Sequence, residues 1–182
     1  MHRTFVIYAS IFSALFALVA RADTPRVFAR SGVGLRGVTV GPIESSQQPD
    51  RGYGSEPSYA LLDELVRLGA NAISITPFGR IWSLHSTVID RDFELPFAQN
   101  RQNVIAFIAA AKARGLRVLL IPHLWVETGG WRGEIDPGSD AGWTAYRASY
   151  RAFVLAWADV AERAGADAFS IGVECKSWSG RF

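Results

Sequence analysis

Three stretches of the chain share one pattern, in which a helical segment ends at a glycine and a nearly continuous apolar segment follows. The glycine and its apolar segment are Gly69 and 70–76, Gly115 and 116–122, and Gly165 and 166–172. Glycine at a helix end supplies the left-handed backbone that turns the chain back. Continuous apolar runs are typical of strands that are buried on both faces of a parallel sheet. With a first strand at 35–40, the pattern predicts β-α-β-α-β-α-β.

Apolar residues recur at helical spacing between these strands. The predicted helices are 57–68, 101–114 and 141–163. Asn100 is the predicted N-cap of the second helix, and Ser139 with Asp140 begins the third. The third helix places one stripe of large side chains along a single face: Trp143, Tyr146, Tyr150, Phe153, Trp157 and Val160. A stripe with a 3.6-residue period is far more often core than a ligand platform, so we predict that it is buried.

Two architectures accommodate this order of elements, an open doubly wound sheet and one half of a (β/α)₈ (TIM) barrel. In a barrel the residues after every strand face one opening, so they should share a chemical character. Aromatic and polar residues do follow three consecutive strands: Phe78, Trp82 and His85, then His123, Trp125 and Trp131, then Glu174 and Trp178. This favours the barrel. The mixture also suits sugars, whose ring faces stack on aromatic planes and whose hydroxyls need polar partners.

Residues 1–22 have the pattern of a secretory signal peptide. A basic start at Arg3 precedes the apolar run 5–20 and a small-residue cleavage pattern that ends at Ala22. The run is shorter than the ~20 residues that a membrane-spanning helix needs, which argues against an uncleaved anchor. We therefore expect a linker at 23–34, a single domain at 35–182, and a secreted or periplasmic protein that does not contact the membrane after cleavage.

Charge and cysteine content exclude several classes of partner. The net charge of +2 comes from Arg3 and Arg21 of the signal, so the mature chain is neutral and offers no basic face to nucleic acid. The G-x-G-x-x-G match at 32–37 precedes a strand instead of following one, so we expect no nucleotide cofactor. Cys175 is the single cysteine; it forms no internal disulfide and is expected to be a buried small hydrophobe.

Four motifs in order along the chain resemble glycoside hydrolase family 113, a clan A (β/α)₈ family similar to endo-β-1,4-mannanases. They are Pro122-His-Leu-Trp-Val126, Trp131-Arg-Gly-Glu-Ile135, Trp143-x-x-Tyr146 and Phe169-Ser-Ile-Gly-Val-Glu174. The resemblance spans about 35–174 and implies that Glu174, at the end of the fourth strand, is the acid/base. It also implies that His123, Trp125 and Trp131 line a polysaccharide cleft. Phe78 and Trp82 are expected to bind the same substrate.

A retaining glycosidase needs a second carboxylate ~5–5.5 Å from the first, and in this family that nucleophile follows the seventh strand. Because four strands are predicted here, we expect an N-terminal half barrel that is inactive alone. Glu127 and Glu134 are the alternatives for the second carboxylate. A half barrel also leaves two unpaired sheet edges, which favour self-association.

Other interpretations of the same residues remain open. Glu174 could be a structural carboxylate paired with Arg80 or Lys176, and His123 could be a hydrogen-bonded residue of the barrel wall. The function could then be non-catalytic carbohydrate binding or that of a scaffold. A metal-dependent hydrolase would use His85, His123 and Glu127, but the first strand end lacks the His-x-His pair of such sites, so we expect neither metal nor cofactor.

Overall fold

The computed structural model describes residues 34–41, 44 and 48–180, so the predicted signal peptide and almost all of the predicted linker lie outside the described residues. Its strands are β1 (Gly37–Val40), β2 (Ala72–Ile75), β3 (Phe78–Ile81), β4 (Arg117–Leu120), β5 (His123–Val126) and β6 (Ala168–Phe169). Its helices are α1 (Glu56–Arg67), α2 (Phe97–Ala113), the short 3₁₀ helix η1 (Arg132–Glu134) and α3 (Asp140–Ala164). Within the described part, no helix is both long and apolar enough to cross a bilayer.

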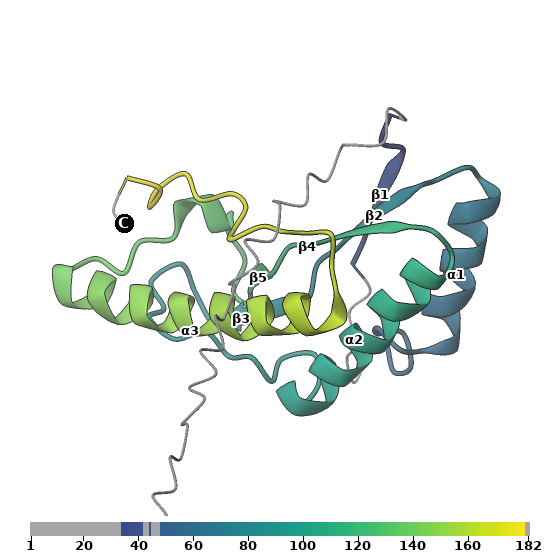
Figure 1. Ribbon diagram of the computed structural model, residues 1–182. Coiled ribbons are helices and arrows are strands. Elements are labelled where there is room, and N and C mark those ends of the chain that lie inside the picture. Colours follow the sequence, from purple (N-terminus) through teal and green to yellow (C-terminus); the bar gives the residue numbers. More distant parts are fainter. Residues whose placement is uncertain (1–33, 42–43, 45–47, 181–182) are drawn as a thin grey trace, which may run out of the picture.

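The main sheet has the order β1-β2-β4-β6, and all of its strands are parallel. The order follows the chain without a reversal, whereas a doubly wound sheet changes direction at a switch point. The helices also form one layer, because α2 packs against both α1 and α3. Figure 1 shows α2 in the middle of this layer, with α1 on one side of it and α3 on the other. Both observations agree with the predicted barrel type and argue against the doubly wound sheet.

Helices α1 and α3 begin at residues whose side chains cap the first turn, and α1, α2 and α3 end near glycines with a left-handed backbone. The Ser55 hydroxyl accepts a hydrogen bond from the Ser58 amide (3.3 Å) at the start of α1, and Ser139 begins α3 as predicted. Gly69, at φ +86°, turns the chain after α1. The prediction for Asn100 was wrong: α2 begins at Phe97, one turn earlier, and Asn100 lies buried inside it.

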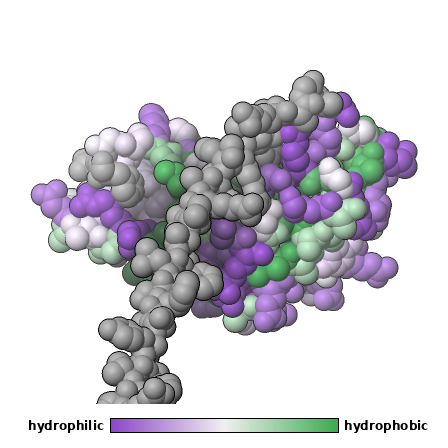
Figure 2. All heavy atoms as spheres, viewed as in Figure 1, coloured by the Kyte–Doolittle hydropathy of each residue, from purple (hydrophilic) through white to green (hydrophobic). Residues whose placement is uncertain are grey.

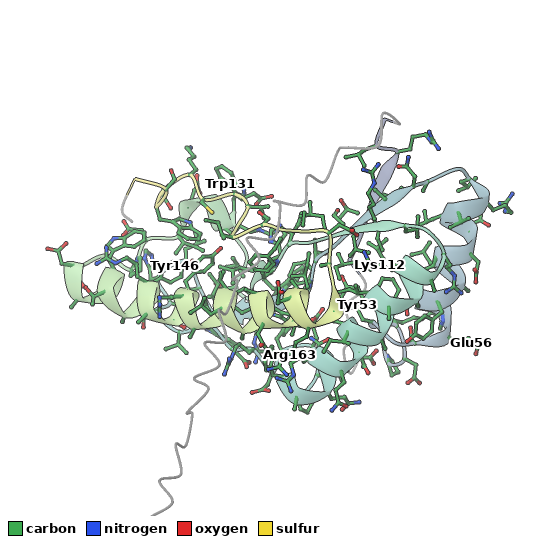
Figure 3. The ribbon with its side chains drawn as sticks, in the orientation of Figure 1. Tyr53, Glu56, Lys112, Trp131, Tyr146 and Arg163 are labelled. Atoms are coloured by element: carbon green, nitrogen blue, oxygen red, sulfur yellow. The ribbon has the colours of Figure 1, made fainter. Side chains whose placement is uncertain are left out.

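The stripe along α3 forms the centre of the core, as predicted. Tyr146, Trp157 and Val160 are fully buried, and Tyr150 is half-buried with its hydroxyl donating to the Ile171 carbonyl (2.7 Å). Figure 3 shows Tyr146 between α3 and the C-terminal segment, and its ring lies 5.5 Å from that of Trp178 in this segment. The aromatic stripe therefore joins the helix layer to the segment that carries Glu174.

The pattern did not predict the second sheet, in which β3 pairs with β5 in parallel. Pro77 and Pro122 interrupt the apolar runs of β2 and β4, and after each proline the chain resumes an extended course. Predicted loop residues therefore lie on strands. The fourth predicted strand is also shorter than expected, because β6 ends at Phe169 and Glu174 follows in an irregular segment.

Both edges of the main sheet are open in the described part of the chain, since β1 pairs with β2 alone and β6 with β4 alone. Burial on both faces was predicted for the three strands that follow the glycines; in the first strand, β1, Val40 is buried and Val38 is 44% exposed. Hydrophobic patches are visible on the side of the molecule where β1 and α1 lie (Figure 2). The self-association expected from such an edge stays a prediction.

Candidate functional site

The β3–β5 sheet presents one row of side chains on its exposed face. Phe78 pairs with His123 and Arg80 with Trp125, and the pairing continues one step further, where the Thr128 amide donates to the Trp82 carbonyl (3.0 Å). The residues between them point to the opposite face and are buried, because successive side chains of a strand alternate. A Cβ atom on Gly79 would lie 2.7 Å from Ile89 and Phe153, so β3 rests directly on α3.

Aromatic rings dominate the first two levels of this row. The Phe78 ring stacks on the His123 ring at 5.4 Å and meets Trp125 edge-on at 6.4 Å. Phe93, from the loop before α2, stacks on Trp125 at 6.4 Å. Trp82, at the far end of the row, is 65% exposed. Four of the residues that were predicted to bind substrate thus lie on one continuous face.

Glu174 lies on the C-terminal segment and is joined to the loop after β5. Its Oε2 accepts a hydrogen bond from Trp131 Nε1 (2.8 Å) and forms an ion pair with Arg132 Nε (3.1 Å). Lys176 Nζ lies over the Trp131 ring, 5.3 Å from its centroid. In Figure 3, Trp131 lies beside the C-terminal segment, on the other side of the strands from α3. Trp131 therefore positions the Glu174 carboxylate through its Nε1–H, while its indole ring stays partly exposed.

Arg132 connects Glu174 to the aromatic row. Its Nη1 donates to His123 Nδ1 and to the Leu124 carbonyl, both at 2.6 Å. Because Nδ1 accepts, the neutral His123 ring carries its proton on Nε2. Burial and the Arg132 charge lower the pKa of His123 to about 4, against a smaller opposing effect of Glu174. His123 is therefore a neutral residue of the wall near pH 7, with Nε2–H as a donor for an uncharged ligand.

Around Arg80, the row on β3 and β5 carries charged side chains that are paired with one another. Arg80 Nη2 donates to Asp90 Oδ2 (2.8 Å), and Arg80 Nη1 lies 3.9 Å from Glu127 Oε2. The guanidinium also lies 5.3 Å from the centroid of the Phe93 ring. Glu127, one alternative for the second carboxylate, is thus joined to Arg80, and Glu134, the other, is exposed on η1.

Glu94 is a buried carboxyl group beneath this face that the sequence pattern did not reveal. Its Oε2 accepts hydrogen bonds from the Phe78 amide (3.1 Å) and from Asn100 Nδ2 (2.8 Å), while Oε1 has no hydrogen-bond partner. Burial, with a smaller contribution from the charge of Glu44, raises the pKa of Glu94 to about 7. Glu94 thereby fixes the start of β3 from the loop before α2.

The unfolding free energy is expected to fall as pH rises from about 4.5 to about 7, because the folded chain keeps the Glu94 proton to a higher pH than the unfolded chain does. The loss is up to about 3 kcal/mol, at about 1.4 kcal/mol per pKa unit. Glu94→Gln removes the ionisation and is expected to flatten this dependence. Urea denaturation of both proteins at pH 5 and pH 8 measures it, and an equally steep loss in the variant would contradict the assignment.

The residues of the metal alternative do not form a metal site in the part of the chain that is described, where no group of three His, Cys, Asp or Glu side chains could hold an ion. His85 is exposed, and its Nδ1 donates to the Asp136 carbonyl (2.6 Å). Cys175 is a free thiol that is half-buried, less than the buried position predicted for it, and burial raises the pKa of this thiol.

A carboxylate held at one end of an aromatic row is the arrangement expected of a sugar-cleaving site. The profile of Glycoside Hydrolase Family 113 matches residues 46–181. The chain belongs to this family. Comparison with curated proteins gives no match.

Solved structures of Family 113 proteins share the fold. The chain is similar to a GH113 β-1,4-mannanase, with a TM-score of 0.67 and 23% identity over 81% of this chain and 48% of that one. It is also similar to the GH113 β-mannanase AaManA from Alicyclobacillus acidocaldarius in complex with ManMIm, with a TM-score of 0.67 and 24% identity over 79% of this chain and 45% of that one. The chain thus spans about half the length of the Family 113 structures it matches, and its fold is that part of a (β/α)₈ barrel.

Two sequence predictions about the Family 113 site need correction. Glu174 is not at the end of a strand; it lies beyond β6 with a left-handed backbone, at φ +54°. Its ion-pair partner is Arg132, whereas Arg80 and Lys176 had been considered. The sequence motif that includes Trp131 also contains Arg132, but a single arginine in a loop carries no signal of its contact with a residue 42 positions later.

Proposed function

We propose that the chain forms the substrate cleft, and supplies the acid/base carboxylate, of a retaining glycoside hydrolase that acts on β-1,4-linked mannan. The observation that carries this proposal is the position of Glu174 beside Trp131, next to an aromatic row, in a member of Family 113. The solved structures that the chain resembles are named as β-mannanases, which supports mannan as the polysaccharide.

In this mechanism Glu174 protonates the glycosidic oxygen as the bond to the leaving sugar breaks, and its carboxylate then takes a proton from the attacking water. A second carboxylate forms the covalent intermediate. Trp131 and Arg132, the partners described for Glu174, are both donors, so they orient the group but cannot act as that nucleophile. We therefore propose that the 182-residue chain binds the polysaccharide. Hydrolysis also needs a nucleophilic carboxylate, and the contacts of Glu174 described above do not supply one.

Carbohydrate binding without hydrolysis is the second candidate. It is favoured by the 3.1 Å ion pair of Glu174 with Arg132, since a carboxylate held in this way has a structural role that requires no chemistry. Export to the periplasm or the medium is a further proposal, and it rests on the sequence pattern of residues 1–22.

Calorimetric titration of the chain with β-1,4-mannohexaose tests the shared part of both candidates. We expect saturable binding and no release of reducing ends during incubation with the same oligosaccharide. Trp125→Ala is expected to weaken the binding, because the indole is 42% exposed in the middle of the row. Leu155→Ala, on the exposed part of α3, is the matched control. Failure of the wild-type chain to bind would overturn the proposal.

A further inference from the structure

The exposed row on β3 and β5 continues past its aromatic levels into a hollow. The hollow has a volume of about 450 Å³, within the range of small-molecule sites, and its lining includes Arg80, Trp82, His85, Ser86, Thr87 and Asp90. It lies at the end of the row opposite to His123, because Trp82 is four residues beyond the partner of His123, Phe78. At roughly 3.3 Å per residue this is about 13 Å along the strand.

The chemistry of the hollow suits a neutral ligand with many hydroxyl groups. The positive charge of Arg80 is already paired with Asp90 at 2.8 Å and with Glu127 at 3.9 Å, so this guanidinium does not favour an anionic ligand. The Asp136 carbonyl can only accept, so His85 carries a proton on Nδ1 and, when neutral, offers Nε2 as an acceptor.

Trp82 adds a flat apolar surface to these polar groups. Its side chain is 65% exposed, although a large aromatic group gains most from burial. A pyranose ring fits both the flat indole and the polar groups. Its apolar face stacks on an indole, and its hydroxyls form hydrogen bonds with groups such as His85 and Ser86.

We propose that the hollow beside Trp82 is a distal sugar subsite, which binds one ring of a polysaccharide chain whose cleaved bond lies at Glu174. This inference rests on the proposed function and deepens it. Because Arg132 joins Glu174 to the His123 end of the row, the hollow is separated from the carboxylate by the length of the row. The site therefore prefers long oligosaccharides, and a disaccharide at Glu174 does not reach Trp82.

The test measures the affinity of the full chain for β-1,4-mannobiose and β-1,4-mannohexaose by calorimetry, in the wild type and in Trp82→Ala. We expect Trp82→Ala to weaken hexaose binding about three- to tenfold, as for the loss of one aromatic stacking contact, and to leave biose binding unchanged. Trp82→Phe keeps a flat ring and is expected to restore most of the affinity. Val66→Ala, at a residue 40% exposed on α1 and outside the hollow, is the matched control and is expected to bind both oligosaccharides like the wild type.

Equal hexaose affinities of the wild type and Trp82→Ala would overturn the distal subsite alone. An equal loss for biose and hexaose would also overturn it, because Trp82 would then act near Glu174 or through the fold. A wild-type chain that binds neither oligosaccharide would overturn the proposed function, and this inference with it. Far-ultraviolet circular dichroism of each variant establishes that the proteins compared are folded.

Discussion

Replacing Glu174 by glutamine is expected to lower the rate of β-mannan hydrolysis by about 10²–10⁴-fold, the usual contribution of a general acid. Glutamine keeps the size of the side chain and an oxygen that can accept from Trp131 and Arg132, but it has no proton to give to the leaving oxygen. The loss should therefore appear in kcat, with little change in the affinity for mannohexaose.

This measurement needs a protein that turns over substrate. A chimera in which residues 48–180 replace the matching part of the Alicyclobacillus acidocaldarius mannanase supplies the remaining strands, since the match covers 45% of that chain. Glu127→Gln in the same chimera is the control, because Glu127 is joined to Arg80 and not to Glu174. Unchanged kcat in the Glu174 variant would exclude the acid/base role. An inactive chimera that still binds mannohexaose would favour the non-catalytic candidate.

Phe107→Ala is expected to reduce the free energy of unfolding by about 3–5 kcal/mol, a large part of the stability of an ordinary domain. The Phe107 side chain, on α2, is fully buried, and its ring lies 5.2 Å from Tyr53 and 6.1 Å from Tyr59 of α1. The Tyr53 hydroxyl in turn donates to the Val40 carbonyl (2.8 Å) and accepts from the Thr76 amide (2.7 Å). A cavity at Phe107 thus loosens the contact between the helix layer and the ends of β1 and β2.

Urea denaturation followed by circular dichroism measures this loss. Val66→Ala, at a residue 40% exposed on α1, also shortens a side chain and is expected to change stability by less than about 1 kcal/mol. Similar effects of the two substitutions would mean that α2 does not pack against the core as described.

The helix layer and the order of the main strands could be predicted from the sequence because both depend on local signals. The stripe from Trp143 to Val160 has a 3.6-residue period, and Gly69, Gly115 and Gly165 all adopt positive φ at the ends of the helices. The second sheet could not be predicted, since four-residue strands after Pro77 and Pro122 show too few alternations to be distinguished from loops.

The residues of the candidate site also fall into those that the sequence could predict and those that it could not. Trp125 and His123 were identified because aromatic and polar residues after a buried strand are conspicuous in a sequence. Glu94 and Arg132 were not, because their roles come from partners that the fold brings close, the Phe78 amide for the one and Glu174 for the other. A carboxyl or guanidinium group in a loop is usually solvated, so the sequence around such a residue gives no reason to expect a buried or bridging role.

The pairing of β3 with β5 constrains how the exposed row on these strands can evolve. Single substitutions at Arg80, Trp82 or Trp125 change one position of the row and leave the others in place, so the chemistry of the exposed face can be altered gradually. Insertion or deletion of one residue within β3 instead exchanges the two faces of the strand, because side chains alternate. Ile81 would then lie on the exposed face and Arg80 in the core, so we expect variation in length among relatives to be confined to the loops that flank this strand.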